Sequence, residues 1–239
     1  MATKFEDLGF FSDEVEEFRE VARGEYKAEF EKVENLISTI LSELGDVPES
    51  ATPGYIVGMG FWLRAIEACQ SSMLIAERGV TSTTFATLRL GYECLFNACA
   101  AWKDEAVLDR MEISNIKERV KQAREMLKYA PAGHLTQTQI NQLTEVTNEN
   151  DKGNGWDYYS AAQTAGLTYM YQESYRGCSL GGAHATATSL NFYHEIEGNG
   201  SSGLFYTASI DKLPFFIGLV VQILETGRKQ RAEFFPIHN

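Results

Sequence analysis

Apolar residues recur every three or four positions along most of this 239-residue chain, and this period constrains the fold more than any other feature. The clearest stretch runs from residue 12 to residue 44. The recurring residues there are Val15, Phe18, Ala22, Tyr26, Phe30, Val33, Ile37, Ile40 and Leu44. Glutamates occupy the opposite face, Ser12 can cap the start and Gly45 can end the run. The pattern predicts a long amphipathic N-terminal helix over 12–44, which Gly24 could divide.

Further helices are expected over about 53–78, 82–102, 104–130, 137–147, 157–180, 183–197 and 211–233. Thr52-Pro53 is typical of an N-cap followed by the first helical residue. The segment 82–102 is apolar nearly all round, which places it at the centre of a bundle. No segment shows convincing strand alternation. We therefore predict an all-α fold: a single domain over 1–239, built as a helical bundle of six to eight helices, with an acidic N-terminal helix over 12–44 and a core bundle over 53–233.

The net charge of −12 is unevenly distributed, since residues 1–50 hold fourteen Asp/Glu against five Lys/Arg. An acidic chain repels phosphate backbones, which argues against broad nucleic-acid binding. A basic run on the helix over 104–130 could contact an anion or could be an ordinary solvated face. Its members are Lys117, Arg119, Lys121, Arg124 and Lys128.

Composition also bears on cofactors and compartment. The four cysteines form no Cys-x-x-Cys pair, so a zinc ribbon or a thioredoxin motif is not expected. We expect no leader before the first charged residues. The longest apolar run near the C-terminus, 213–224, is shorter than the roughly 20 residues that a membrane span needs. We expect a cytoplasmic protein with reduced core cysteines, no membrane segment, no metal and no cofactor.

The charged pair Arg89 and Glu93 is the most informative motif. The two residues lie four apart and therefore share one face of the apolar helix over 82–102. Charges in such a helix require partners. The pair could be a structural ion pair between helices, or it could form part of a polar pocket.

A second cluster of polar and aromatic residues surrounds the dipeptide Gly181-Gly182, where backbone can approach a ligand or another helix closely. Its members are Tyr171, Tyr175, Arg176, Ser179, His184 and Thr188. Histidine can act as an acid or a base near neutral pH. His184 could equally be an interface or core histidine.

Several stronger catalytic patterns are missing from the sequence. It has no paired Glu-x-x-His of a di-iron bundle, no phosphate loop after a strand and no Gly-x-Ser-x-Gly nucleophile elbow.

The segment Thr87-Leu88-Arg89-Leu90-Gly91-Tyr92-Glu93, with the later pattern of Tyr171, Tyr175, Ser179 and His184, resembles a bacterial family of helical domains of unknown function. That resemblance covers about residues 55–225 and implies an all-α fold without an assigned activity. The family is distantly similar to the HEPN helical domains, some of which are metal-independent ribonucleases of toxin and phage-defence systems. Their catalytic pattern is Arg, four to six residues, then His. Arg176 and His184 are separated by seven residues, so this chain departs from it.

Three functions remain open. The first is a regulatory or interaction domain, with a homodimer favoured. Its support is a set of small residues that would allow close helix contact, namely Gly166, Gly177, Gly181, Gly182, Ala183 and Ala185.

The second is a HEPN-like ribonuclease. In it His184 would transfer a proton, Arg89 or Arg176 would stabilise developing negative charge, and Glu93 would orient Arg89 or His184.

The third is a pocket for a small anionic ligand, either a carboxylate or a phosphate. The residues considered for its walls are Trp62, Tyr92, Tyr171, Tyr175 and Ser179. Aromatic residues at helical spacing also fit an ordinary core.

Overall fold

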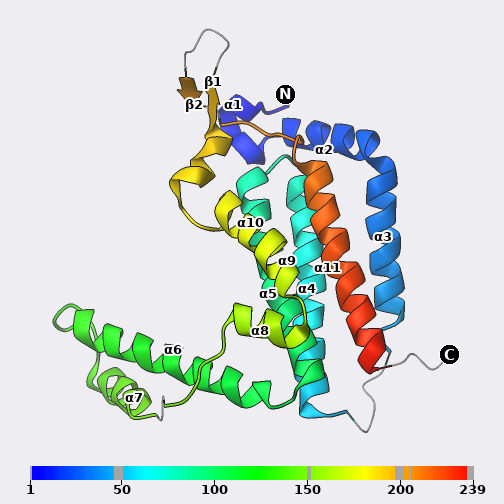
Figure 1. The fold of residues 1–239 in the computed structure, drawn as a ribbon. Coiled ribbons are helices and arrows are strands. Elements are labelled where there is room, and N and C mark those ends of the chain that lie inside the picture. Colours follow the sequence, from blue (N-terminus) through cyan, green and yellow to red (C-terminus); the bar gives the residue numbers. More distant parts are fainter. Residues whose placement is uncertain (1, 46–50, 150–151, 197–201, 205, 236–239) are drawn as a thin grey trace.

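The computed structural model describes residues 2–45, 51–149, 152–196, 202–204 and 206–235, and it confirms the all-α fold class (Figure 1). The longer helices are α2 (Glu14–Glu25), α3 (Lys27–Ser42), α4 (Pro53–Ala76), α5 (Thr81–Lys103), α6 (Val107–Tyr129), α7 (Gln137–Thr147), α8 (Tyr158–Ala165) and α11 (Leu213–Phe234). The short helical elements are α1 (Phe5–Leu8), η1 (Gly9–Phe11), α9 (Thr168–Met170), η2 (Tyr171–Tyr175), α10 (Arg176–Cys178), η3 (Ser179–Ala183) and η4 (Ala187–Tyr193). Strands β1 (His194–Ile196) and β2 (Ser202–Leu204) form one antiparallel pair.

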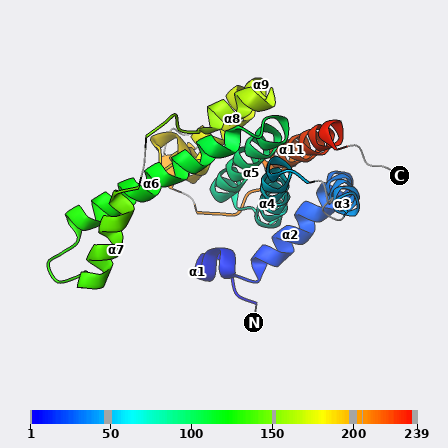
Figure 2. The same ribbon diagram turned by 90° about the horizontal axis from the view of Figure 1, so that it is seen from below.

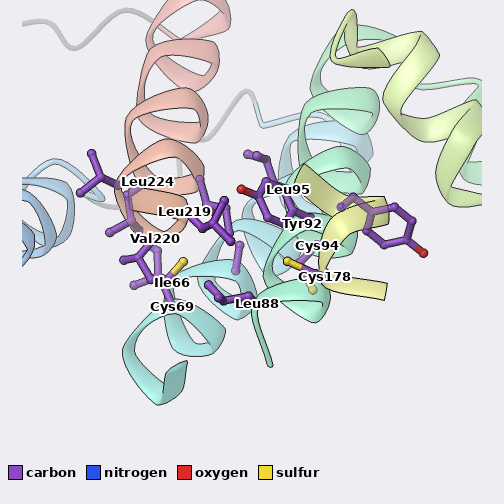
Figure 3. Packing of buried hydrophobic residues seen from close by; sticks show 14 of the residues in the cluster. Ile66, Cys69, Leu88, Tyr92, Cys94, Leu95, Cys178, Leu219, Val220 and Leu224 are labelled. Atoms are coloured by element: carbon purple, nitrogen blue, oxygen red, sulfur yellow. The ribbon is translucent and has the colours of Figure 1, made fainter. Parts of the chain in front are cut away.

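Three helices, α4, α5 and α11, form the centre of the molecule, with α2 and α3 on one side and α8 to α10 on the other (Figure 2). Helix α5 is central, as its apolar sequence predicts, because every residue of the run 94–102 is buried. The core side chains include Ile66 of α4, Leu95 of α5, Val220 of α11 and Cys178 of α10 (Figure 3). All four cysteines are buried and free, in agreement with the expected reduced core cysteines.

The acidic helix expected over 12–44 is two helices, and the prediction of one continuous helix is wrong. The chain turns at Tyr26, which has φ −110° and ψ 35°. Helix α2 crosses the end of the bundle, where Arg19 and Arg23 bind the buried Glu77 at the end of α4. Helix α3 instead runs along α11 (Figure 1). Two packing directions therefore require a bend, and it falls just after Gly24, a weak helix former.

The segment expected as one helix over 157–180 is also divided. Helix α8 ends at Gly166, whose φ of 76° is left-handed and suits glycine. Beyond it, α9 to η3 continue as one helical segment that contains two π-helical turns, η2 and η3. Such turns have hydrogen bonds between residues i and i+5, and they are frequent at functional sites.

The helix expected over 183–197 does not form as predicted. Gly182 leaves the helical region at φ 175° and ψ −9°, and His184 is extended. The chain then forms the 3-10 helix η4 and strand β1, which pairs with β2. Phe192 stacks on Phe85 of α5 at 5.5 Å between ring centroids. In this segment the ring contact with α5 and the pairing of β1 with β2 stand in place of the hydrogen bonds of the expected helix.

Helices α6 and α7 form an arm that projects away from the bundle (Figure 2). The segment just before α8 contacts the arm near its base. The Arg110 guanidinium lies 4.7 Å from the Trp156 ring, and Ser114 donates to the Trp156 carbonyl at 3.1 Å. Among the described residues, no helix is long and apolar enough to cross a membrane.

Candidate functional site

The predicted Arg89–Glu93 pair lies at the edge of α5 and faces the helical segment η2. The Arg89 Nε and Glu93 Oε1 atoms are 2.9 Å apart, and the two side chains are 20% and 14% exposed. Both charged side chains are therefore mostly buried, and a small part of each is still accessible to solvent. The i, i+4 spacing on a rigid, buried helix fixes their relative position.

Tyr175 of η2 completes this pair with a hydroxyl that both accepts and donates. It accepts from Arg89 Nε at 3.2 Å and Nη2 at 3.0 Å, and it donates to Glu93 Oε1 at 3.1 Å. The guanidinium also lies 5.2 Å from the ring centroid. Burial raises the pKa of the Tyr175 hydroxyl to about 12, with the Glu93 charge acting in the same direction and Arg89 opposing it. Tyr175 is therefore neutral and positions Arg89 at ordinary pH.

His184 reaches the same arginine from a third segment of the chain. Its Nε2 contacts Arg89 Nη1, and its side chain is exposed. A guanidinium has donors and no acceptor, so His184 Nε2 can only be the acceptor in this contact. Each terminal guanidinium nitrogen carries two N–H groups. An anion can therefore approach Arg89 while the Tyr175 contact is kept.

The dipeptide Gly181-Gly182 brings His184 to this position. A Cβ on Gly181 would lie 2.9 Å from the Phe85 ring, and one on Gly182 would lie 2.6 Å from the Ser82 carbonyl oxygen. Only glycine allows the backbone of η3 to cross α5 so closely. The close approach expected from the sequence is thus with helix α5.

A shallow hollow of about 320 Å³ opens beside the pair. Its lining residues are Ala86, Arg89, Leu90, Glu93 and Tyr158. Tyr158 directly follows the N-cap residue Asp157, whose Oδ1 accepts from the Ser160 amide at 2.7 Å. Burial raises the pKa of the Tyr158 hydroxyl, and the charge of Glu93 raises it further.

The other site residues expected from the sequence lie around this cluster or away from it. Arg176 is exposed and donates to Gln172 at 3.1 Å, and Ser179 donates to the Tyr175 carbonyl at 3.0 Å. Tyr171 stacks on Tyr175 with 4.8 Å between centroids. None of these three described contacts reaches Arg89 itself.

Two aromatic residues considered for a ligand pocket belong to the core. Tyr92 is fully buried and donates to Gln222 Oε1 at 2.5 Å. Trp62 is also fully buried. Their helical spacing reflects packing against α11.

Sequence reasoning missed Tyr158 and Tyr159. Both follow the exposed glycine-containing loop and the capping residue Asp157, and both remain partly exposed. The signal was available: the buried face of α8 consists of Ala161, Ala162 and Ala165, so two adjacent tyrosines at its start exceed what packing needs.

The cluster can bind an anion through Arg89 and transfer a proton through His184. Among the described residues, no group of three or more His, Cys, Asp or Glu side chains could hold a metal ion. The fold and the site together define an all-α bundle protein with an arginine–histidine site at the edge of its central helix.

Residues 55–202 match the Family of unknown function (DUF5677), which is more than half of the chain, and the protein belongs to this family. The matched range contains Arg89, Glu93, Tyr175 and His184, whereas α2, α3 and α11 lie outside it. Neither the curated proteins nor the solved structures contain a significant match to the chain.

Proposed function

We propose that this protein is a metal-independent ribonuclease of the HEPN-like kind, with Arg89 and His184 at its active site. The observation that carries the proposal is the contact between these two side chains, which are 95 residues apart in sequence. Arg89 also lines the open hollow. Glu93 and Tyr175 are positioning residues, since they bind the guanidinium on its other edge.

The proposed reaction begins when a phosphate of RNA binds Arg89. A phosphate oxygen takes over the Nη1–H that His184 Nε2 now accepts, because a charged acceptor forms the stronger hydrogen bond. The released Nε2 accepts the proton of the ribose 2′-hydroxyl, and the 2′-oxygen attacks phosphorus. The bond from phosphorus to the 5′-oxygen breaks, and that oxygen takes a proton from the imidazolium or from water. The products are a 2′,3′-cyclic phosphate and a 5′-hydroxyl.

The acidic composition is compatible with this proposal because most of the net negative charge lies in the first fifty residues. The arm formed by α6 carries the basic run, whose residues Arg119, Lys121, Arg124 and Lys128 are exposed. A bacterial toxin or phage-defence role, a cytoplasmic location, a single domain and a homodimer belong to the same proposal.

The test is cleavage of a labelled single-stranded RNA in the presence of a chelator. The wild-type protein is expected to release 2′,3′-cyclic phosphate ends. His184→Ala should lower the rate roughly 100-fold or more, because a positioned acid or base contributes at least that much. His134→Ala alters an exposed histidine beyond the end of α6, away from the cluster, and serves as the matched control. Cleavage that requires a metal, or that survives in His184→Ala, would contradict the proposal.

A second candidate is a binding site for a small carboxylate or phosphate, without chemistry. The hollow of about 320 Å³ favours it, because this is the scale of a small-molecule site. Binding of inorganic phosphate or a nucleotide that depends on Arg89, with no RNA cleavage at any protein concentration, would select this function over the first.

A further inference from the structure

Tyrosines form a continuous aromatic surface beside the Arg89 site. Tyr171 stacks on Tyr175, and Tyr159 meets Tyr171 edge to face at 5.4 Å between centroids. Tyr158 lies 6.2 Å from Tyr175 and lines the hollow itself. Tyr158 is 38% exposed and Tyr159 is 42% exposed. Aromatic surface therefore extends from the buried guanidinium partner out to solvent.

The two rings contact tyrosines of η2, and the packing of α8 on α5 does not need them. The helix packs on α5 through small residues, namely Ala161, Ala162 and Ala165. Tyrosine rings combine a large apolar face with a polar hydroxyl, and they lose little entropy on binding a ligand because only two torsions are fixed. A pair of such rings at the mouth of a polar hollow is suited to a flat, partly apolar group.

Resting on the proposed function, we infer that Tyr158 is a stacking platform that selects single-stranded RNA. Arg89 holds a phosphate in the hollow, the nucleobase of the same or the next nucleotide stacks on Tyr158, and Tyr159 offers a ring to a following base. Every base has a flat face, so this contact tolerates any sequence. In a duplex the bases are stacked inside the helix, and neither ring can reach them.

The experiment measures binding separately from cleavage. The ligand is a trinucleotide of 2′-O-methyl adenylate, which has no free 2′-hydroxyl and cannot be cut by the proposed reaction. The same trimer without bases is the comparison ligand. Calorimetric titration of wild-type protein should give about tenfold tighter binding of the adenine trimer, since one stacked base contributes on that order.

The variants assign this preference to Tyr158. Tyr158→Ala should bind both trimers equally, at the affinity of the abasic one, and Tyr158→Phe should keep the preference because it keeps the ring. Tyr129→Ala is the matched control, since Tyr129 is 67% exposed at the far end of α6. It should behave as wild type.

Equal binding of the two trimers by wild type, a preference unchanged in Tyr158→Ala, or no binding of either trimer would overturn the inference. Failure of the ribonuclease proposal is seen separately. In that case labelled RNA stays intact, while the base preference and its loss in Tyr158→Ala can still be measured.

Discussion

At the scale of single residues, the hydroxyl of Tyr175 is the atom on which the Arg89–Glu93 pair depends. Tyr175→Phe removes the acceptor of Arg89 Nε and Nη2 and the donor to Glu93, in a nearly buried position. Buried groups that lose their hydrogen-bond partner cost about 1–3 kcal/mol each, so we expect a loss of about 2 kcal/mol in unfolding free energy. Urea denaturation near neutral pH measures it.

The same variant should change the response to alkaline pH. The folded-state pKa of Tyr175 is about 12, above its ordinary value of 10.0. The folded protein thus holds this proton more tightly than the unfolded chain, so the contribution to stability is present below pH 10 and is lost as the pH rises towards 12. Tyr175→Phe should lose less stability over this window than wild type. If the unfolding free energy of both proteins fell equally with pH over this window, the raised pKa of the buried Tyr175 hydroxyl would be contradicted.

At the scale of elements, the crossing of η3 over α5 depends on Gly181. An alanine Cβ there would meet the Phe85 ring at 2.9 Å, so Gly181→Ala must displace either the ring or the backbone. Overpacking of this kind costs about 1–3 kcal/mol. Gly177→Ala is the control, because its Cβ would meet no atom within 4 Å and alanine favours a helix. We expect Gly181→Ala to lower the melting temperature and Gly177→Ala to leave it equal or higher.

Gly181→Ala should also weaken the site, because His184 follows the crossing by three residues. Phosphate binding, or RNA cleavage where it is found, is expected to fall in Gly181→Ala and to stay at the wild-type level in Gly177→Ala. A destabilised variant with an unchanged site would show that His184 is positioned by other contacts.

Helices were predictable from sequence where local rules decide them. Thr52 caps α4 and Pro53 begins it, and the run 82–102 is central because it is apolar on every side. A division of the N-terminal helix near Gly24 was allowed for, and the break lies at Tyr26, whereas the break at Gly166 was not predicted; where each break falls depends on how the two halves pack. Strand β1 was read as helix because its pairing with β2 is a tertiary contact absent from any local period.

The site divides in the same way. Arg89 and Glu93 could be paired from their spacing alone, within one helix. Their meeting with His184 could not, because it requires the π-helical turns of η2 and η3 and the close crossing at Gly181. Tyr92 has the helical spacing that a pocket residue would have, yet it belongs to the core. Helical periodicity shows which face of a helix is buried, but it does not show whether another helix or a ligand covers that face.

At the scale of the whole molecule, charged contacts fasten the acidic N-terminal helices to the helices of the central bundle, α4 and α11. The fully buried Glu77 accepts from Arg19 Nε at 2.7 Å and from Arg23 Nε at 2.6 Å, which ties α2 to α4. At the other end, Glu43 pairs with Arg228 of α11. Helices α2 and α3 lie outside the matched range, so these contacts join an added layer to the bundle.

This layer should loosen in acid before the bundle does. The hydrogen bond from Arg228 holds the pKa of Glu43 below its ordinary value of 4.5, with burial opposing it. The contribution of Glu43 to stability is therefore present above pH 4.5 and is lost as the pH falls through the lower, folded-state pKa. We expect amide exchange in α3 to accelerate relative to α5 as the pH falls below 4.5, after correction for intrinsic rates. Glu43→Gln should show part of that acceleration at neutral pH, with a stability loss of about 0.5–1 kcal/mol because Arg228 is half exposed.

Glu31→Gln, which alters an exposed pair with Lys27, is the control. If α3 and α5 lose protection together at every pH, the N-terminal helices are an inseparable part of the bundle, and the charged contacts only align them.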